Sequence, residues 1–286
     1  MGFVLTDDVQ RFHDAAWPLL AARLDGNVIA SVLLGALEGR YHDVEAWFAY
    51  RSDDRGHAVT AALRTAPFPM LCTALVPGEA ELLLDSWMTA DRSLPGINGL
   101  PQTARSLAAA WTARTGGAAT VVRSMAMHAV SEVVDAPHRP EGGLRLAHPQ
   151  ERDLLTEWWQ AFAQEAGAIS TPVFAERQVQ ARLDEDGAFV WDDGGPVSLV
   201  AISPPVAGVP RIGPVYTPPE HRRRGYAGSA VGEVSRRALA GGAPHVTLFT
   251  DLANPTANKI YAEVGYRRFG DWEEHAFHPR AAPRVG

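Results

Sequence analysis

The sequence predicts an α/β protein built from two halves that repeat one order of helices and strands. Helical and extended hydrophobic patterns alternate along most of the chain. Residues 211–266 have the pattern of a strand, a glycine-bearing loop, a helix, a second strand and a second helix. A polar segment rich in proline and glycine, residues 135–143, separates the two halves.

Composition limits the class of protein. At 286 residues the chain is long enough for about two domains with real cores. The formal net charge of −7 argues against nucleic acid as a main partner, since nucleic-acid binders carry a basic face. Cys72 is the single cysteine, which excludes an internal disulfide and favours a cytoplasmic setting. No apolar run reaches membrane-spanning length, and Asp7 and Asp8 stand where a signal peptide needs positive charge.

In the first half, hydrophobic periodicity and turn residues define the elements in order. We expect helices at 7–24, 27–37, 79–90 and 102–115, strands at 44–51, 58–64, 70–76 and 118–130, and a proline- and glycine-rich loop at 93–100. The linker then divides the chain into an N-terminal domain, residues 1–134, and a C-terminal domain, residues 144–286.

The second half repeats this order. We expect a strand at 144–146, helices at 149–166 and 172–183, strands at 188–192 and 197–203, and then the elements of 211–266. Residues 59–67 align faintly with 197–205, since each is a strand that ends in proline. The order predicts a duplicated fold, and an unrelated α/β lobe in the first half is the alternative.

The loop after the strand at 211–217 has the features of an anion site. Gly225 and Gly228 permit positive φ and close approach of a ligand. The helix pattern that follows places free N–H groups and the positive end of a helix dipole at the loop. Three arginines, residues 222–224, add positive charge at the same place, and a solvated charge run is the alternative. A pyrophosphate would fit such a loop.

Arg222-x-x-Gly225-x-Ala227 after an apolar strand resembles the pyrophosphate loop of the GNAT superfamily of acetyl-CoA-dependent N-acetyltransferases. The segment from Asn254 through Tyr261 to Tyr266 resembles the last helix of the same family. The resemblance implies a mixed, mostly antiparallel sheet flanked by helices, with a degenerate GNAT-like first half.

The resemblance also implies a set of residues that bind acetyl-CoA. The strand end would present backbone groups to the pantetheine arm and thioester, and the loop would hold the pyrophosphate. Two asparagines near the last helix would add contacts. The implied set is Val215, Tyr216, Thr217, Arg222, Arg223, Arg224, Gly225, Tyr226, Ala227, Gly228, Asn254 and Asn258.

Tyr261 is the expected general acid. In direct transfer an amine attacks the thioester and a thiolate leaves, and a phenol can deliver a proton to that sulfur. The family places a tyrosine at this position, while a packed aromatic is the structural alternative. Asn254 precedes Pro255 and suits a helix N-cap as well as a cofactor contact.

The general base is less defined. Trp158, Phe162 and Glu165 recur at helical spacing, so Glu165 could lie at the edge of an aromatic pocket, although a glutamate near a helix end is usually solvent-exposed. We expect no metal, because no cluster has ligand spacing.

The first half has the acidic segment 77–81 where the second has its arginine and glycine loop. Phosphate would be repelled there, and we expect one acetyl-CoA per chain, bound by the second half.

The leading hypothesis is therefore an enzyme that moves the acetyl group of acetyl-CoA directly to a primary amine of a small molecule or peptide. A noncatalytic acyl-CoA-binding or regulatory protein is the alternative. A tandem transferase that uses aminoacyl-tRNA is disfavoured by the acidic charge. The sequence leaves the acceptor and the oligomeric state open.

Overall fold

The chain folds into two compact units in a computed structural model, which describes residues 2–135 and 139–280. The first unit combines Met1–Met125 with Gly270–Gly286, and the second is Ala126–Phe269. Parts of the predicted linker and C-terminal domain, residues 136–138 and 281–286, lie outside the described residues.

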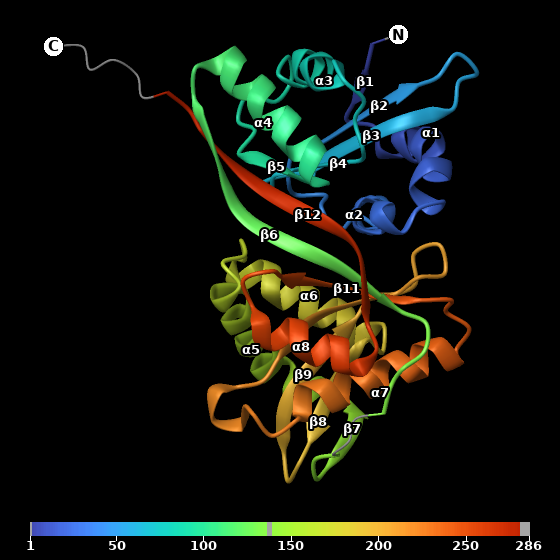
Figure 1. The fold of residues 1–286 in the computed structure, drawn as a ribbon, viewed down its shortest axis with the longest axis vertical. Coiled ribbons are helices and arrows are strands. Elements are labelled where there is room, and N and C mark those ends of the chain that lie inside the picture. The colour runs from blue at the N-terminus through green and yellow to red at the C-terminus, as the bar shows by residue number, and fades with distance from the viewer. Residues whose placement is uncertain (1, 136–138, 281–286) are drawn as a thin grey trace, which may run out of the picture. The chain divides into compact units, whose positions relative to one another are not determined.

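The first unit contains four α-helices, a short 3₁₀ helix and a sheet within its described residues (Figure 1). In chain order they are β1 (Val4–Thr6), α1 (Val9–Ala21), η1 (Leu24–Gly26), α2 (Asn27–Leu37), β2 (Ala46–Ser52), β3 (Ala58–Thr65), β4 (Met70–Cys72), α3 (Glu79–Trp87), β5 (Gly96–Gly99), α4 (Pro101–Thr115) and the first part of β6 (Ala118–Val130). Its sheet has the order β1-β2-β3-β4-β5-β12 followed by β6, and β4 with β5 is a parallel pair.

Strand β12 (Arg267–His278) is the last strand of the chain, yet its residues from 270 onward belong to the first unit. Its antiparallel pairing with β5 runs from Glu273 opposite Gly99 to Ala276 opposite Gly96. Strand β6 passes from the first unit into the second at residue 126. Strands β6 and β12 therefore each contribute residues to both units.

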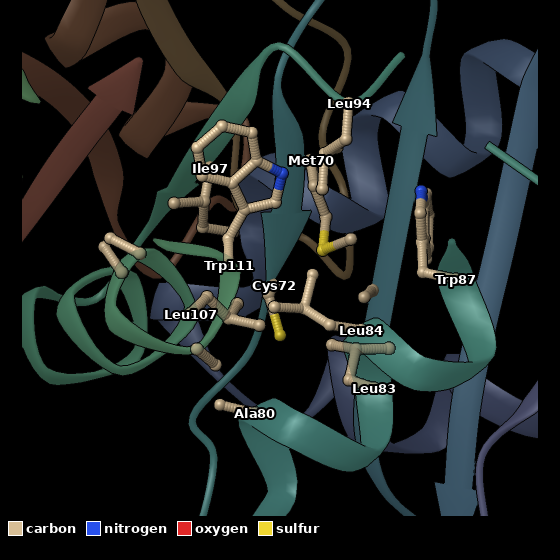
Figure 2. Packing of buried hydrophobic residues seen from close by; sticks show 14 of the residues in the cluster. Met70, Cys72, Ala80, Leu83, Leu84, Trp87, Leu94, Ile97, Leu107 and Trp111 are labelled. Atoms are coloured by element: carbon tan, nitrogen blue, oxygen red, sulfur yellow. The ribbon is translucent and has the colours of Figure 1, made fainter. Parts of the chain in front are cut away.

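The core of the first unit lies between the sheet and helices α3 and α4 (Figure 2). Met70, Cys72 and Ile97 from the central strands face Leu83, Trp87, Leu107 and Trp111 from the helices. Trp111 stacks on Phe277 of β12 with ring centroids 4.4 Å apart, so β12 is part of this core. On the other face Phe48 packs against Phe12 of α1, because neighbouring strand residues point to opposite faces.

The second unit repeats the element order of the first (Figure 1). It contains β7 (Gly143–Leu146), η2 (Pro149–Glu151), α5 (Arg152–Glu165), α6 (Pro172–Asp184), β8 (Ala188–Asp192), β9 (Pro196–Ile202), β10 (Arg211–Tyr216), η3 (Pro219–His221), α7 (Tyr226–Ala240), β11 (Val246–Asp251) and α8 (Pro255–Val264). Its sheet has the order β6-β11-β10-β9-β8-β7, in which β10 and β11 are parallel and β7 to β10 pair antiparallel.

Alternating residues of β8 build the two faces of this sheet. Phe189 and Trp191 pack against α7 and α8, whereas Ala188 and Val190 pack against α5 and α6. The mixed, mostly antiparallel sheet with helices on its faces confirms the predicted fold class. Within the parts of the chain that are placed, no helix combines the length and the apolar character needed to cross a bilayer.

One predicted loop is wrong. Residues 96–99 form β5, in the middle of the first unit's sheet, although proline and glycine there predicted a loop at 93–100. The glycines serve close approach between strands, since a Cβ on Gly96 would lie 2.1 Å from the carbonyl oxygen of His275. The predicted division into domains at residues 135–143 stays a prediction. The compact units are bounded at residues 125/126 and 269/270, so they do not test a division at this linker.

A buried ion pair stabilises the first unit. Arg64 and Asp91 are 5% and 2% exposed, and the Arg64 guanidinium donates to the Asp91 carboxylate at 2.6 Å. Trp87 and Ser93 also donate to this carboxylate. Burial by itself raises the pKa of Asp91, but the hydrogen bond from Trp87 and the charge of Arg64 outweigh it and place the pKa below its usual value.

We predict that Arg64→Ala lowers the free energy of unfolding by about 3–5 kcal/mol, because it leaves a buried carboxylate unpaired. Urea denaturation measures the loss. The exposed pair of Arg114 with Asp85 in the same unit provides the control, and Arg114→Ala should cause no measurable loss. Equal effects of the two substitutions would contradict the prediction.

The depressed pKa of Asp91 also predicts a pH dependence. The stabilisation is complete above the pKa of an unfolded aspartate, about 4, and is lost as the pH falls through the lower folded value. The stability of Asp91→Asn should therefore fall less steeply than that of the wild type below about pH 4.

Candidate functional site

Strand β10 leaves its neighbour β11 part of the way along the sheet. The parallel pairing covers Arg211 opposite Thr247 and Ile212 opposite Leu248, and no later pair forms within the described residues. The register of β10 against β9 also shifts between Ile212 and Val215, which marks a bulge. The edge of β10 that faces β11 is therefore free of ladder hydrogen bonds around Val215.

The loop after β10 leads into α7, and a run of backbone amides at this junction has no hydrogen-bond acceptor among the described residues. Gly225 is the N-cap residue of α7 with a φ of +87°, a conformation that glycine adopts without strain. The first backbone amide with an acceptor is that of Ser229, which donates to the Gly225 carbonyl. In the described part of the chain, the amides of residues 223–228 have no acceptor. These six amides form an N–H cradle at a helix N-terminus, the arrangement that binds phosphate groups.

The predicted role of Gly228 needs correction. Gly228 lies inside α7 and does not adopt positive φ. A Cβ at this position would lie 3.4 Å from Cγ2 of Ile260, so the glycine allows α7 and α8 to pack closely. Tyr226 and Ala227 occupy the first turn of α7, and the Tyr226 hydroxyl donates to Asp193 at 2.5 Å. The Tyr226 hydroxyl is thus bound to Asp193, and the contribution of this residue to the cradle is its backbone amide.

Arg222 differs from its two neighbours. Its Nε donates to the carbonyl of Thr217 at 2.7 Å, and its Nη2 donates to both carboxylate oxygens of Glu165 at 2.7 and 2.9 Å. The guanidinium also lies over the ring of Tyr216. Arg222 therefore ties the loop to the end of α5. Arg223 and Arg224 are also exposed, and Nη2 of Arg224 donates to the carbonyl of Glu220 at 3.3 Å.

Glu165 lies at the last residue of α5 with its side chain 51% exposed. The structure brings it to the loop through Arg222, a contact between residues far apart in the sequence. The ring centroid of Trp158 on α5 lies 6.3 Å from that of Tyr216. Tyr216 is therefore next to Trp158 on one side and to the Arg222 guanidinium, which binds Glu165, on another.

Tyr261 lies on α8, half-buried against the core of the second unit. Its ring packs edge-on against Tyr266 with centroids 6.1 Å apart. Its hydroxyl donates to no group among the residues that the structure describes. Burial raises the pKa of this phenol well above its usual value, so the hydroxyl keeps its proton at neutral pH.

The two predicted asparagines hold the start of α8. Asn254 is the N-cap, and its side chain accepts from the amide of Ala257 at 3.0 Å. The Asn258 amide group donates to the carbonyls of Asp251 and Asn254, and its oxygen accepts from the hydroxyl of Thr250 at 2.5 Å. Both side chains thus stabilise the turn between β11 and α8.

Sequence reasoning missed Ser198 of β9. Its hydroxyl donates to the carbonyl of Tyr216 at 3.1 Å and hydrogen-bonds the Thr217 hydroxyl at 2.8 Å. With Arg222 on the Thr217 carbonyl, the end of β10 is fixed from both sides. A serine in a buried strand carries no local signal of this contact. No group of three metal-binding side chains occurs in the described ranges.

We predict that Asn258→Ala is more destabilising than Asn254→Ala. The first removes three hydrogen bonds of a half-buried side chain and should cost about 2–3 kcal/mol, while loss of the N-cap bond should cost about 1 kcal/mol. Thermal unfolding of both variants measures the difference. If the variants were equally stable, the turn would not depend on Asn258.

Solved structures with the same fold cover nearly the whole chain. A GNAT-family acetyltransferase from Colwellia psychrerythraea is 12% identical, with 98% of this chain and 100% of that chain covered and a TM-score of 0.62. A GCN5-related N-acetyltransferase from Sphaerobacter thermophilus is 18% identical, with 99% and 98% covered and a TM-score of 0.61. At these identities the likeness establishes the fold.

A tandem GNAT protein from the clavulanic acid biosynthesis pathway, solved without AcCoA, is 14% identical, with 98% and 99% covered and a TM-score of 0.60. No curated protein sequence matches the chain. Residues 152–266 match the model of the acetyltransferase (GNAT) family, and this segment contains the diverging strand, the N–H cradle and Tyr261. The chain therefore belongs to the GNAT superfamily, with a GNAT domain in its C-terminal half and a second, GNAT-like fold in its N-terminal half.

Proposed function

We propose that the chain is an N-acetyltransferase that moves the acetyl group of acetyl-CoA directly to a primary amine of a small molecule. Membership of the GNAT family supports acyl transfer in general. The proposal goes further, because it names acetyl-CoA as the donor and a primary amine as the acceptor.

The observation that carries the proposal is the run of amides at residues 223–228 without acceptors, next to the diverging edge of β10. Backbone N–H groups without partners are costly unless water or a ligand satisfies them. A pyrophosphate on this cradle, with Arg223 and Arg224 beside it, satisfies them with matching charge. The free edge of β10 at Val215 then offers backbone groups to an extended pantetheine arm.

Tyr261 supplies the proton for the leaving group in this proposal. The amine nitrogen attacks the thioester carbonyl carbon, the carbon–sulfur bond breaks, and the sulfur leaves with the bonding electron pair. The Tyr261 hydroxyl donates its proton to this sulfur. The free hydroxyl supports this role, because a phenol is protonated at neutral pH and this one is bound to no other described group.

Glu165 is the proposed base that takes the proton from the attacking amine. Both of its carboxylate oxygens accept from Arg222, so Arg222 competes with an amine for the Glu165 carboxylate. The same contact favours the second candidate, a noncatalytic acyl-CoA-binding protein, because it occupies the proposed base.

Thiol release from acetyl-CoA distinguishes the two candidates when it is measured against a panel of small amines, amino acids and peptides. A rise in thiol release with one amine class supports the enzyme. Donor binding by calorimetry without turnover of the panel supports the binding protein. If acetyl-CoA does not bind, both fail.

We predict that Tyr261→Phe lowers kcat at least about 10-fold and leaves the Kd of acetyl-CoA unchanged, since only the proton donor is lost. Tyr266→Phe is the matched control. It removes the hydroxyl that hydrogen-bonds Ser235 at 2.8 Å in the core, so stability falls while kcat changes little. An unchanged kcat in Tyr261→Phe would exclude the acid role.

We predict that Gly225→Ala weakens acetyl-CoA binding at least about 10-fold, because an alanine at positive φ strains the loop and turns its amides out of alignment. Gly242→Ala, at the other end of α7, is the control with a similar φ of +99° and no part in the cradle. Both variants should lose about 1 kcal/mol of stability. Equal donor affinities would show that the Gly225 conformation does not support the cradle.

A further inference from the structure

The first unit contains the same strand–loop–helix connection as the second. Strand β4 leads through a short loop into α3, and β10 leads through a short loop into α7. Each helix begins after a glycine in the left-handed conformation, Gly78 with a φ of +85° and Gly225 with a φ of +87°. Val76 and Arg223 each lie two residues before that glycine, so their amides are counterparts.

In the first unit two amides of this loop donate to side chains of the protein. The Val76 amide donates to the carboxylate of Glu79 at 2.8 Å, and the Leu75 amide donates to the Thr103 hydroxyl at 3.2 Å. Arg223, the counterpart of Val76, contributes its amide to the cradle, whereas the amide of Arg222, the counterpart of Leu75, donates to the Pro219 carbonyl. A carboxylate of the chain thus takes the place that a ligand oxyanion would occupy.

The surroundings of Glu79 match a bound anion. Glu79 is 4% exposed, and its carboxylate forms an ion pair with Arg51 of β2 and accepts from the Thr60 hydroxyl of β3 at 3.3 Å. Nε of Arg51 is also buried and has no acceptor among the described residues. A cationic side chain, a hydroxyl and a backbone amide therefore converge on one carboxylate.

Strand β4, which precedes this loop, has no unpaired edge toward its neighbour β5. All three residues of β4 pair with β5, from Met70 opposite Ile97 to Cys72 opposite Gly99. In the second unit the corresponding pair separates after Ile212. The first unit thus lacks the free strand edge, and the Glu79 carboxylate accepts from the Val76 amide of the loop that corresponds to the cradle.

We infer that Glu79 is a built-in substitute for a phosphate group, which holds the first unit closed to a ligand through Arg51, Thr60 and the Val76 amide. The inference goes beyond the proposed function, because it concerns the first unit and is independent of catalysis. Removal of the carboxylate leaves donors and a positive charge that inorganic phosphate can satisfy.

The test is the thermal stability of the full chain with and without inorganic phosphate, at constant ionic strength maintained with sodium chloride. Glu79→Ala should melt below the wild type, and about 10 mM phosphate should raise its melting temperature by at least about 2 °C more than it raises that of the wild type. Glu81→Ala, an exposed glutamate on the same helix, is the charge-matched control and should respond as the wild type does. The double variant Arg51→Ala/Glu79→Ala should lose the phosphate response.

An equal response of Glu79→Ala, Glu81→Ala and the wild type would overturn the inference. If Glu79→Ala does not fold, Glu79→Gln keeps the shape of the side chain and removes its charge. Glu79→Gln should then melt below Glu81→Gln, and equal melting temperatures would likewise overturn the inference.

Discussion

Backbone amides at the junction of a strand and a helix need acceptors, and this requirement shapes both units of the chain. In the second unit the amides of residues 223–228 have no acceptor among the described residues and lie beside three exposed arginines, residues 222–224. In the first unit the side chains of Glu79 and Thr103 accept from the amides of Val76 and Leu75 in the equivalent loop. The same connection is therefore suited to an anionic ligand in one unit, whereas in the other the chain itself supplies acceptors for two of its amides.

The strands that precede these two loops also differ between the units. The bulge in β10 and its separation from β11 leave an edge free beside the cradle, whereas β4 is paired along its length. Arg222 connects this region, since it joins the loop, the Tyr216 ring and Glu165 at the end of α5. Anything that displaces Glu165 from Arg222 thus acts on the loop and on α5 together.

The passage of β6 and β12 through both units is a feature that sequence patterns could not reveal. Strand β6 was expected from its residues and matches the predicted bounds. Periodicity identifies a strand and its buried face, but it does not identify the neighbour, because pairing depends on contacts between distant residues. The stacking of Trp111 on Phe277 becomes visible only when β12 is placed in the first unit. For the same reason Gly96 and Gly99 indicated a loop, although they serve a crowded central strand.

The sequence by itself determined the order of most elements, the glycine at the start of α7, the N-cap at Asn254 and the family of the C-terminal half. These features depend on backbone preferences and on contacts within a few residues. Only the tertiary structure decided that Glu165 pairs with Arg222, that Asn258 hydrogen-bonds across the turn before α8 and that Glu79 is buried beside Arg51. Each of these outcomes depends on how packing orients a side chain and on which groups then satisfy its charge or hydrogen bonds, which local sequence does not specify.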